Sequence, residues 1–322
     1  MAPQESVWTL KGLSMQHLRQ IDQLSLDSCS LTIGSFDGVH KGHQALVQKL
    51  VAQAHADNTT AVVLTFYPHP SVVLRGRKPA FYINTPEEKS ELLGELGVDI
   101  VITQPFDLEL SKVTAEEFIN ELQSFCGFRD LWVGEDFALG HNRRGDRFYL
   151  EREGEQRGFK LHKVKPVLVS GEIVSSTRVR EALRSGDVAR VERYLGRPFE
   201  VPGVVVKGAG RGRDLGFPTA NLEIWEERAF PRGGVYACIA MVDGDHWKAV
   251  TNIGVRPTFN SDEVSPTVET HLLGYSDDLY DKNIRLSFIA RLRDERKFAS
   301  PEALMQRIQI DIQRAEEILK GR

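Results

Sequence analysis

The rhythm of secondary structure changes near residue 187, and this change limits the possible folds more than any other feature of the sequence. Before it, apolar strand-like runs alternate with helical patterns. Four such runs are predicted to be strands, at residues 31–33, 61–66, 98–103 and 131–133. Two helix starts carry a full capping signature, because Thr85 and Thr114 are each followed three residues later by Glu. This alternation predicts an α/β domain with a parallel sheet and right-handed crossovers.

Beyond residue 187, strands follow one another without helices between them. Five are predicted, at residues 201–206, 235–242, 247–253, 267–273 and 284–292. A helix capped by Ser300 then closes the chain. This order predicts a small antiparallel β-barrel with a closing helix. We therefore expect two domains, residues 1–186 and 187–322, which suits a chain of 322 residues.

Composition excludes several classes of protein. The net charge of −4 argues against a general nucleic-acid coat, which needs clustered Lys and Arg. The three cysteines are odd in number and far apart, so neither a disulfide framework nor a cysteine zinc site is expected. No apolar run approaches the roughly 18 residues of a membrane span, and no secretory segment follows the polar start. The cytoplasm is the expected compartment.

The first candidate site lies where the strand at 31–33 meets the next helix. Residues 34–43 read Gly-Ser-Phe-Asp-Gly-Val-His-Lys-Gly-His. Free amides and the helix dipole favour an anion at such a junction, and His40 and His43 can share one helical face. Two alternatives are a glycine-rich turn with surface histidines and a His-x-x-His metal pair. No nearby Cys or third His completes the metal pair, so we expect a phosphate site.

A second candidate for phosphate binding is the segment 174–180, Val-Ser-Ser-Thr-Arg-Val-Arg. It predicts a helix start with serine caps, and its hydroxyls, free amides and guanidinium groups suit a polyphosphate. Taken alone, the segment favours a capped surface helix. Its pairing with the first motif favours the polyphosphate.

The predicted barrel carries a third candidate site, in the loop at residues 207–221. No P-loop occurs in the chain and these glycines do not fit a dinucleotide-binding pattern, so a flexible basic loop is the alternative. Thr219 and Asn221 are two residues apart on an extended segment and can turn both oxygens toward one Mg²⁺. Further along, Glu269 lies in an alternating segment that places it on one strand face with His271. An exposed strand glutamate is the alternative.

These motifs resemble two known signatures. Gly34-x-Phe36-Asp37-x-x-His40-x-Gly42-His43 is similar to the signature of the HxGH nucleotidylyltransferases, and residues 174–180 are similar to its second, triphosphate-binding signature. Residues 203–222 resemble the flavokinase signature. Together they resemble bacterial bifunctional riboflavin kinase/FAD synthetases over residues 32–320. This resemblance implies a Rossmann-like FMN adenylyltransferase domain and a flavokinase-type barrel.

The resemblance also implies roles for single residues. ATP of the adenylyltransferase would contact Gly34, Phe36, Asp37, His40, Gly42, His43, Ser176, Thr177 and Arg178, of which His40 and His43 are catalytic. FMN would contact His69, Asp136 and Phe137. In the 134–140 loop, Leu139 stands where the family usually has Phe.

In the kinase domain, ATP would contact Gly208, Gly210, Arg211, Gly212, Gly216, Phe217 and Pro218. Mg²⁺ would bind Thr219 and Asn221, Glu269 would be the base, and the flavin would contact Arg256 and Arg293.

The implied function is a two-step synthesis of flavin cofactors. The barrel would phosphorylate riboflavin with ATP to give FMN, and the N-terminal domain would adenylylate FMN with a second ATP to give FAD and pyrophosphate. One alternative is that only one half is active, or that the N-terminal domain adenylylates another phosphomonoester. Another is that the barrel is a module that binds nucleic acid or protein, but its strands are poor in the interleaved aromatics of single-strand binders.

Overall fold

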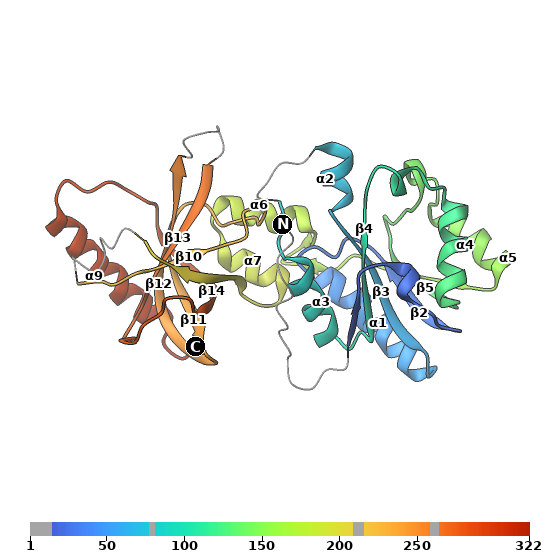
Figure 1. Ribbon diagram of the computed structural model, residues 1–322, viewed down its shortest axis with the longest axis horizontal. Helices are drawn as coiled ribbons and strands as arrows, with labels where there is room; N and C mark the ends of the chain where they lie inside the picture. Colours follow the sequence, from blue (N-terminus) through green and yellow to red (C-terminus); the bar gives the residue numbers. More distant parts are fainter. Residues whose placement is uncertain (1–14, 77–80, 209–215, 258–263) are drawn as a thin grey trace. The chain divides into compact units, whose positions relative to one another are not determined.

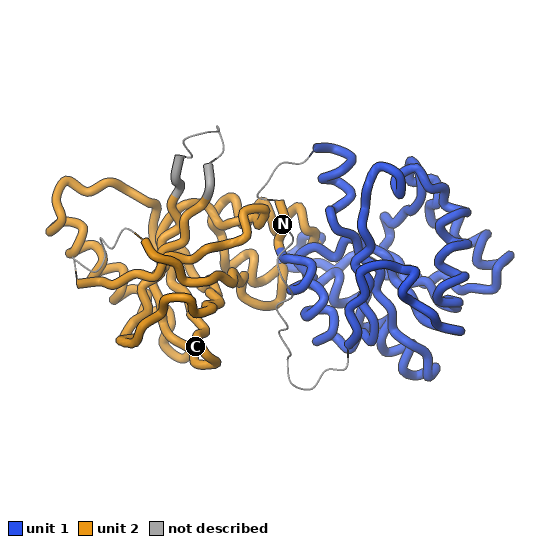
Figure 2. The backbone as a smooth tube through the Cα atoms, viewed as in Figure 1, with its two compact units in different colours: residues 1–78, 84–173 blue, residues 79–83, 174–322 orange. Residues whose placement is uncertain are grey.

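The computed structural model describes residues 15–76, 81–208, 216–257 and 264–322. The chain divides into two compact units, residues 1–78 with 84–173 and residues 79–83 with 174–322 (Figure 2). This division falls at 173/174, ahead of the boundary at 186/187 that the sequence pattern predicts. The helix α6 (Ser176–Ser185) lies between the two points, and it packs on α7 (Val188–Leu195), which follows the second one. A local pattern does not say which core takes their apolar faces, so the boundary at 186/187 stays a prediction.

The first unit is built on a parallel sheet in the order β1-β4-β3-β2-β5-β6 (Figure 1). The strands are β1 (Gln16–Leu18), β2 (Cys29–Ile33), β3 (Thr60–Tyr67), β4 (Ile100–Pro105), β5 (Asp130–Gly134) and β6 (Lys160–Val164). Every pairing between these strands is parallel. The predicted parallel α/β domain is therefore confirmed.

Helices cover both faces of this sheet. They are α1 (Lys41–Ala56), α3 (Pro86–Glu95), α4 (Ala115–Cys126) and α5 (Arg147–Arg157). The short helix α2 (Pro70–Arg75) follows β3 and has no buried residue. Along β3, Ala61 and Val63 join the core that contains α1 and α3 residues, and Val62 and Leu64 join the core that contains α4 and α5 residues. A strand buried on both faces reads as a continuous apolar run, which is why the sequence revealed it. The capping boxes at Thr85 and Thr114 are both present, as predicted.

The strand order places a switch point between β2 and β5. From β2 the chain moves outward through β3 and β4, and it then returns to add β5 on the other side of β2. In open parallel sheets, the loops at such a point part from each other and leave a crevice at the carboxyl ends of the strands. The loops after β2 and β5 therefore flank the expected binding site. These loops contain residues 34–40 and 135–146.

The second unit contains a closed antiparallel barrel in the order β10-β13-β12-β11-β14-β9. Its strands are β9 (Phe199–Val206), β10 (Ala220–Glu223), β11 (Gly234–Val242), β12 (Asp245–Pro257), β13 (Val264–Leu272) and β14 (Asn283–Arg293). The helix α9 (Pro301–Ile318) packs on β11, β12 and β14. Five of these strands and the closing helix were predicted, and only the short β10 was not.

Candidate active site

The loop between β2 and α1 turns in a left-handed backbone conformation. The φ angle is 46° at Phe36, 85° at Gly38 and 40° at Val39. Residues with a bulky side chain rarely adopt positive φ, at a cost on the order of 1–3 kcal/mol each, so neighbouring structure must hold the turn. Phe36 and Val39 are both buried in the core that contains α1. Their burial anchors the turn and brings the start of α1 to the carboxyl edge of the sheet.

The residue just before this turn, Ser35, is hydrogen-bonded to two further elements through its carbonyl oxygen. The Ser35 carbonyl accepts a hydrogen bond from Thr65 Oγ1 of β3 at 3.0 Å and from Lys89 Nζ of α3 at 3.1 Å. Sequence reasoning did not single out Lys89 or Thr65. Lys89 lies four residues before the buried Leu93, so the helical period would have placed it on the buried face.

The two histidines of the motif form a compact pair at the start of α1. His40 is the N-cap, and its Nδ1 accepts a hydrogen bond from the backbone N–H of His43 at 3.3 Å. Their rings stack with centroids 3.6 Å apart, and Phe36 meets the His43 ring edge-on at 5.1 Å. The structure thus brings Phe36, His40 and His43 together, as the motif predicts.

The charge state of His43 follows from this packing. Burial lowers the pKa of His43 well below its ordinary value, and the nearby charges of His40 and Lys89 lower it further. The imidazole is therefore neutral near pH 7. Its buried Nδ1 has no hydrogen-bond partner among the described residues. His43 can meet a phosphate through a hydrogen bond and not through a full positive charge.

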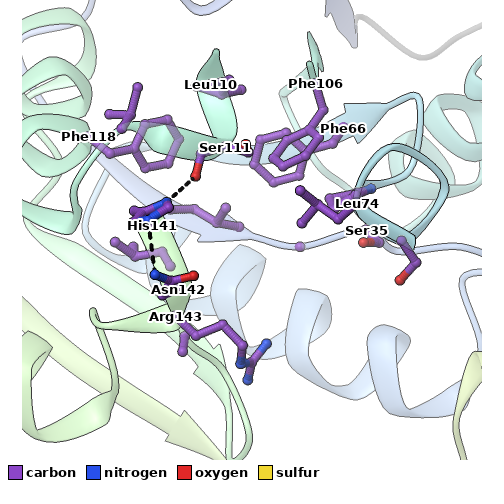
Figure 3. A pocket seen from close by; sticks show the side chains of 18 of the residues that line it. Ser35, Phe66, Leu74, Phe106, Leu110, Ser111, Phe118, His141, Asn142 and Arg143 are labelled. Carbon is purple, nitrogen blue, oxygen red and sulfur yellow. Dashed lines mark hydrogen bonds between the residues drawn. The ribbon is translucent and has the colours of Figure 1, made fainter. Parts of the chain in front are cut away.

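A cavity of about 740 Å³ opens beside this loop at the carboxyl edge of the sheet (Figure 3). Cavities of this size hold small ligands and cofactors. Four predicted site residues line it: Gly34, His69, Asp136 and Phe137. The remaining lining adds a mostly apolar wall, which includes Phe66, Leu74, Phe106, Leu110 and Phe118. An apolar wall of aromatic and aliphatic side chains suits a flat ring system.

One end of the cavity is polar. His141 Nδ1 lies 3.0 Å from the Ser111 carbonyl, Asn142 Nδ2 lies 2.9 Å from His141 Nε2, and both contacts are drawn in Figure 3. Arg143 Nη2 donates to the carbonyl of Asp136 at 2.6 Å. The family resemblance places the loop that contains these residues beside FMN and adenine, but it assigns no separate role to His141, Asn142 or Arg143. The cavity therefore combines an apolar wall with a cationic, hydrogen-bonding end.

Other predicted residues of the adenylyltransferase site do not line this cavity. Asp37 is buried, and its Oδ1 accepts a hydrogen bond from the backbone N–H of Asn84 at 3.4 Å. Ser176, Thr177 and Arg178 form the first turn of α6, where Ser175 caps the helix by accepting from the N–H of Arg178. This turn belongs to the second unit, and the histidine pair belongs to the first. Their joint contact with one triphosphate stays a prediction.

In the second unit, Glu269 faces two asparagines across adjacent strands. Antiparallel pairing sets Glu269 of β13 opposite Asn221 of β10 on one side and opposite Asn252 of β12 on the other. Directly opposed residues point to the same face of a sheet. Val268 and Thr270 are buried, so Glu269 and both asparagines lie on the outer face of the barrel. The structure thus brings together Asn221 and Glu269, two predicted site residues that lie far apart in the sequence.

Asn221 lies over Gly208, which the sequence also singled out. A Cβ on Gly208 would lie only 2.0 Å from Asn221 Nδ2 and 2.9 Å from its Oδ1. Only a glycine therefore leaves room for the amide. Thr219 is exposed and Asn221 is half-buried. Oxygen donors of this kind, open to solvent, fit a Mg²⁺ ion that keeps several waters.

His271 ties the Thr219 segment to the barrel. Its Nδ1 lies 2.7 Å from the carbonyl oxygen of Pro218, and its ring meets Phe217 at right angles with centroids 6.0 Å apart. Because His271 follows Glu269 by two residues, one strand carries both the glutamate and the anchor of the opposite segment. The sequence pattern predicted that His271 and Glu269 share one strand face, but it gave no sign of the contact with Pro218.

Of the other residues predicted for the kinase site, some are not described by the structure and one has a structural contact. Gly210, Arg211, Gly212 and the side chain of Arg256 lie outside the described residues. Arg293 Nε donates to Asp311 Oδ2 of α9 at 2.7 Å, and only 14% of its side chain is exposed. This ion pair joins β14 to the closing helix and gives Arg293 a structural role. Its flavin contact stays a prediction that this geometry does not favour.

Among the described residues, no group of three or more His, Cys, Asp or Glu side chains could hold a metal ion. In the same part of the chain, no helix combines the length and the apolar character that crossing a membrane requires.

Comparison with known proteins matches both halves of the chain. A family model described as FAD synthetase matches residues 22–178, and one described as riboflavin kinase matches residues 195–319. A crystal structure from Streptococcus pneumoniae, named a macrolide-efflux protein, has a TM-score of 0.86 and 27% identity. The match covers 96% of this chain and 100% of that one.

Curated relatives carry both activities in their names. The bifunctional riboflavin kinase/FMN adenylyltransferase of Pseudomonas fluorescens is 38% identical, over 92% of this chain and 96% of its own length. The protein of the same name from Escherichia coli strain K12 is 36% identical, over 91% and 94%. The chain therefore belongs to the bifunctional riboflavin kinase/FMN adenylyltransferase family, with an FAD synthetase domain followed by a riboflavin kinase domain.

Proposed function

We propose that the two sites perform successive steps of flavin cofactor synthesis with the residues described above. The barrel transfers the γ-phosphoryl group of ATP to the 5′-hydroxyl of riboflavin, giving FMN and ADP. The first unit then transfers AMP from a second ATP to the phosphate of FMN, giving FAD and pyrophosphate. Each site meets an anionic nucleotide with loop amides and a few polar side chains.

In the kinase step, Glu269 accepts the proton of the 5′-hydroxyl as the new oxygen–phosphorus bond forms. The bond between the γ-phosphorus and the β-bridging oxygen breaks, and ADP leaves. Phosphoryl transfer depends mainly on positioning and on charge neutralisation, so Glu269 needs only to orient the hydroxyl and receive its proton. Thr219 and Asn221 hold Mg²⁺, which when bound neutralises charge on the phosphates.

In the adenylyl step, an oxygen of the FMN phosphate attacks the α-phosphorus of ATP and pyrophosphate leaves. The nucleophile is already an anion, so the step needs alignment and stabilisation of the leaving group more than a base. The amides at the start of α1 and the imidazoles of His40 and His43 supply hydrogen bonds to the phosphates, and burial keeps the His43 ring neutral. Ser176, Thr177 and Arg178 supply hydroxyls and a cation for the same group.

The cavity beside the β2–α1 loop is the proposed site of the flavin. Its apolar wall fits the isoalloxazine ring, and the cationic end at Arg143 fits a phosphate. The observation that carries the assignment of the adenylyltransferase is this cavity. It is bordered by Gly34 and Ser35, and the same short loop continues directly into the histidine pair.

The test separates the two steps in one polypeptide. The protein is incubated with riboflavin, ATP and Mg²⁺, and the flavins are separated by chromatography over time. FMN should appear before FAD. His43→Ala should abolish FAD formation and leave FMN formation intact, and Asn221→Ala should do the reverse when FMN is supplied directly. Equal loss of both activities in either variant contradicts separate sites.

A further inference from the structure

Lys89 is a buried cation directly beneath the histidine motif. It lies at the end of the first turn of α3, and only 6% of its surface is exposed. Its ammonium donates to the Ser35 carbonyl at 3.1 Å and to Thr65 Oγ1 at 2.8 Å. An ammonium that leaves water loses hydration, and two hydrogen bonds to neutral oxygens replace it only in part. A charge kept at such a place calls for an explanation.

Local stability supplies only part of that explanation. The Thr65 hydroxyl already donates to the same Ser35 carbonyl at 3.0 Å, so this oxygen keeps a partner without Lys89. The charge of Lys89 also offsets the buried carboxylate of Asp37, and an apolar side chain at this position would leave that carboxylate without it. Beyond this balance of charge, Lys89 contributes a positive charge and a rigid contact to one carbonyl of the β2–α1 loop.

That carbonyl belongs to the residue that links the two parts of the proposed site. Ser35 lines the cavity (Figure 3), and it directly precedes the left-handed turn that leads to His40 and His43. A shift of Ser35 would move the cavity wall and the start of α1 together. The charge of Lys89 also acts on the motif, because it lowers the pKa of His43 and so helps keep that imidazole neutral.

We propose that Lys89 is a positioning residue for adenylyl transfer, which fixes the β2–α1 loop through the Ser35 carbonyl and adds positive charge beneath the nucleotide phosphates. The proposal rests on the proposed function of the first unit. Lys89 touches no substrate in this scheme. It acts through Ser35 and through its charge.

Lys89→Met tests the proposal, and the kinase domain of the same chain is the internal control. We expect kcat/KM for FAD formation, measured with FMN and ATP, to fall at least 10-fold, and riboflavin kinase activity to change less than 2-fold. Lys49→Met is the matched control, because Lys49 is an exposed lysine on α1, and both activities should stay within 2-fold. FAD formation by Lys89→Met within 2-fold of the unmodified enzyme overturns the proposal.

The pH profile distinguishes the charge from a packing role. Burial lowers the pKa of Lys89 to about 8, and the charges of Asp37 and Glu87 oppose this shift. The ammonium therefore loses its proton as pH rises through about 8, and FAD formation should fall with it in the unmodified enzyme but not in Lys89→Met. The other ionisable groups that act on Lys89 or lie beside it are the carboxyls of Asp37 and Glu87 and two histidines. His17 on β1 and His43 on α1 have lowered pKa values, so neither gains charge in this range.

A second variant decides the case if Lys89→Met does not fold. Thr65→Val keeps the shape of the side chain and removes the hydroxyl that contacts both Ser35 and Lys89. We expect a 3- to 10-fold fall in kcat/KM for FAD formation with the kinase activity unchanged. No change in FAD formation overturns the proposal. Absence of FAD formation by the unmodified enzyme refutes the proposed function itself, whereas FAD formation that is insensitive to both variants refutes only the role of Lys89.

Discussion

Replacing Gly208 by alanine offers a direct test of the proposed metal site in the kinase domain. The added Cβ would lie 2.0 Å from Asn221 Nδ2, where ordinary contacts begin at 3.4 Å. The amide must therefore move by about 1.4 Å, which is a small displacement for a side chain but a large one for a metal ligand. Because the obstacle is the end of a flexible side chain, we expect the barrel to fold.

The size of the effect follows from that displacement. A misplacement of about 1 Å in a reacting assembly can cost on the order of 100-fold in rate, equivalent to about 2.7 kcal/mol of activation free energy. We therefore expect kcat of riboflavin phosphorylation to fall about 100-fold in Gly208→Ala, with a shift to higher Mg²⁺ requirement. FAD formation from supplied FMN should not change, because the residues proposed for that step lie in the first unit and at the start of α6, outside the barrel strands.

The assay measures FMN formation over a series of Mg²⁺ concentrations and FAD formation from FMN in the same preparation. Gly233→Ala is the matched control in the barrel, because a Cβ there would make only an ordinary contact of 3.4 Å with the Ile253 carbonyl. It should retain both activities. Full riboflavin kinase activity in Gly208→Ala at low Mg²⁺ would refute the assignment of Asn221 as a ligand.

Three further predictions concern the barrel. Glu269→Gln should lower riboflavin phosphorylation by about 10²- to 10⁴-fold, the usual contribution of a positioned base, while FAD formation from FMN is unchanged; a loss under 10-fold would remove Glu269 from the mechanism. His271→Ala removes the 2.7 Å contact to the Pro218 carbonyl, so KM for ATP in the kinase step should rise about 3- to 10-fold with kcat changed less; steady-state kinetics would contradict this if KM stayed the same. Asp311→Asn breaks the buried ion pairs with Arg293 and Arg307 and should lower the free energy of unfolding by about 3 kcal/mol in urea denaturation; a change below about 1 kcal/mol would show that these pairs do little for stability.

Much of the fold could be predicted because its signals are local. The capping boxes at Thr85 and Thr114, the apolar run of β3 and the hairpin turn at Asp243 are each written within a few consecutive residues. Short elements without such signals were missed. β1 has only three residues, and β10 has four. Neither shows enough period to stand out from a loop.

The candidate site also contains parts that local sequence signals predict and parts that they do not. The histidine pair could be predicted because His40 and His43 lie three residues apart at one helix start. The polar end of the cavity could not, because Asn142 and Arg143 gain their meaning only from the loops that meet them. Arg293 shows the opposite case. Its basic segment resembled a ligand contact, but folding places the buried carboxylate of Asp311 beside it.

Amino-acid order is enough to predict the two-domain plan, the strand–loop–helix junction of the first unit and the residues of the candidate motifs. Only folding places Asn221 opposite Glu269, brings Lys89 into contact with the Ser35 carbonyl and forms one cavity between the loops after β2 and β5. The difference lies in the sequence separation over which the interactions act. Caps and periodicities are energies between near neighbours, whereas strand register and burial are set by contacts across long loops, whose chain entropy only the complete fold offsets.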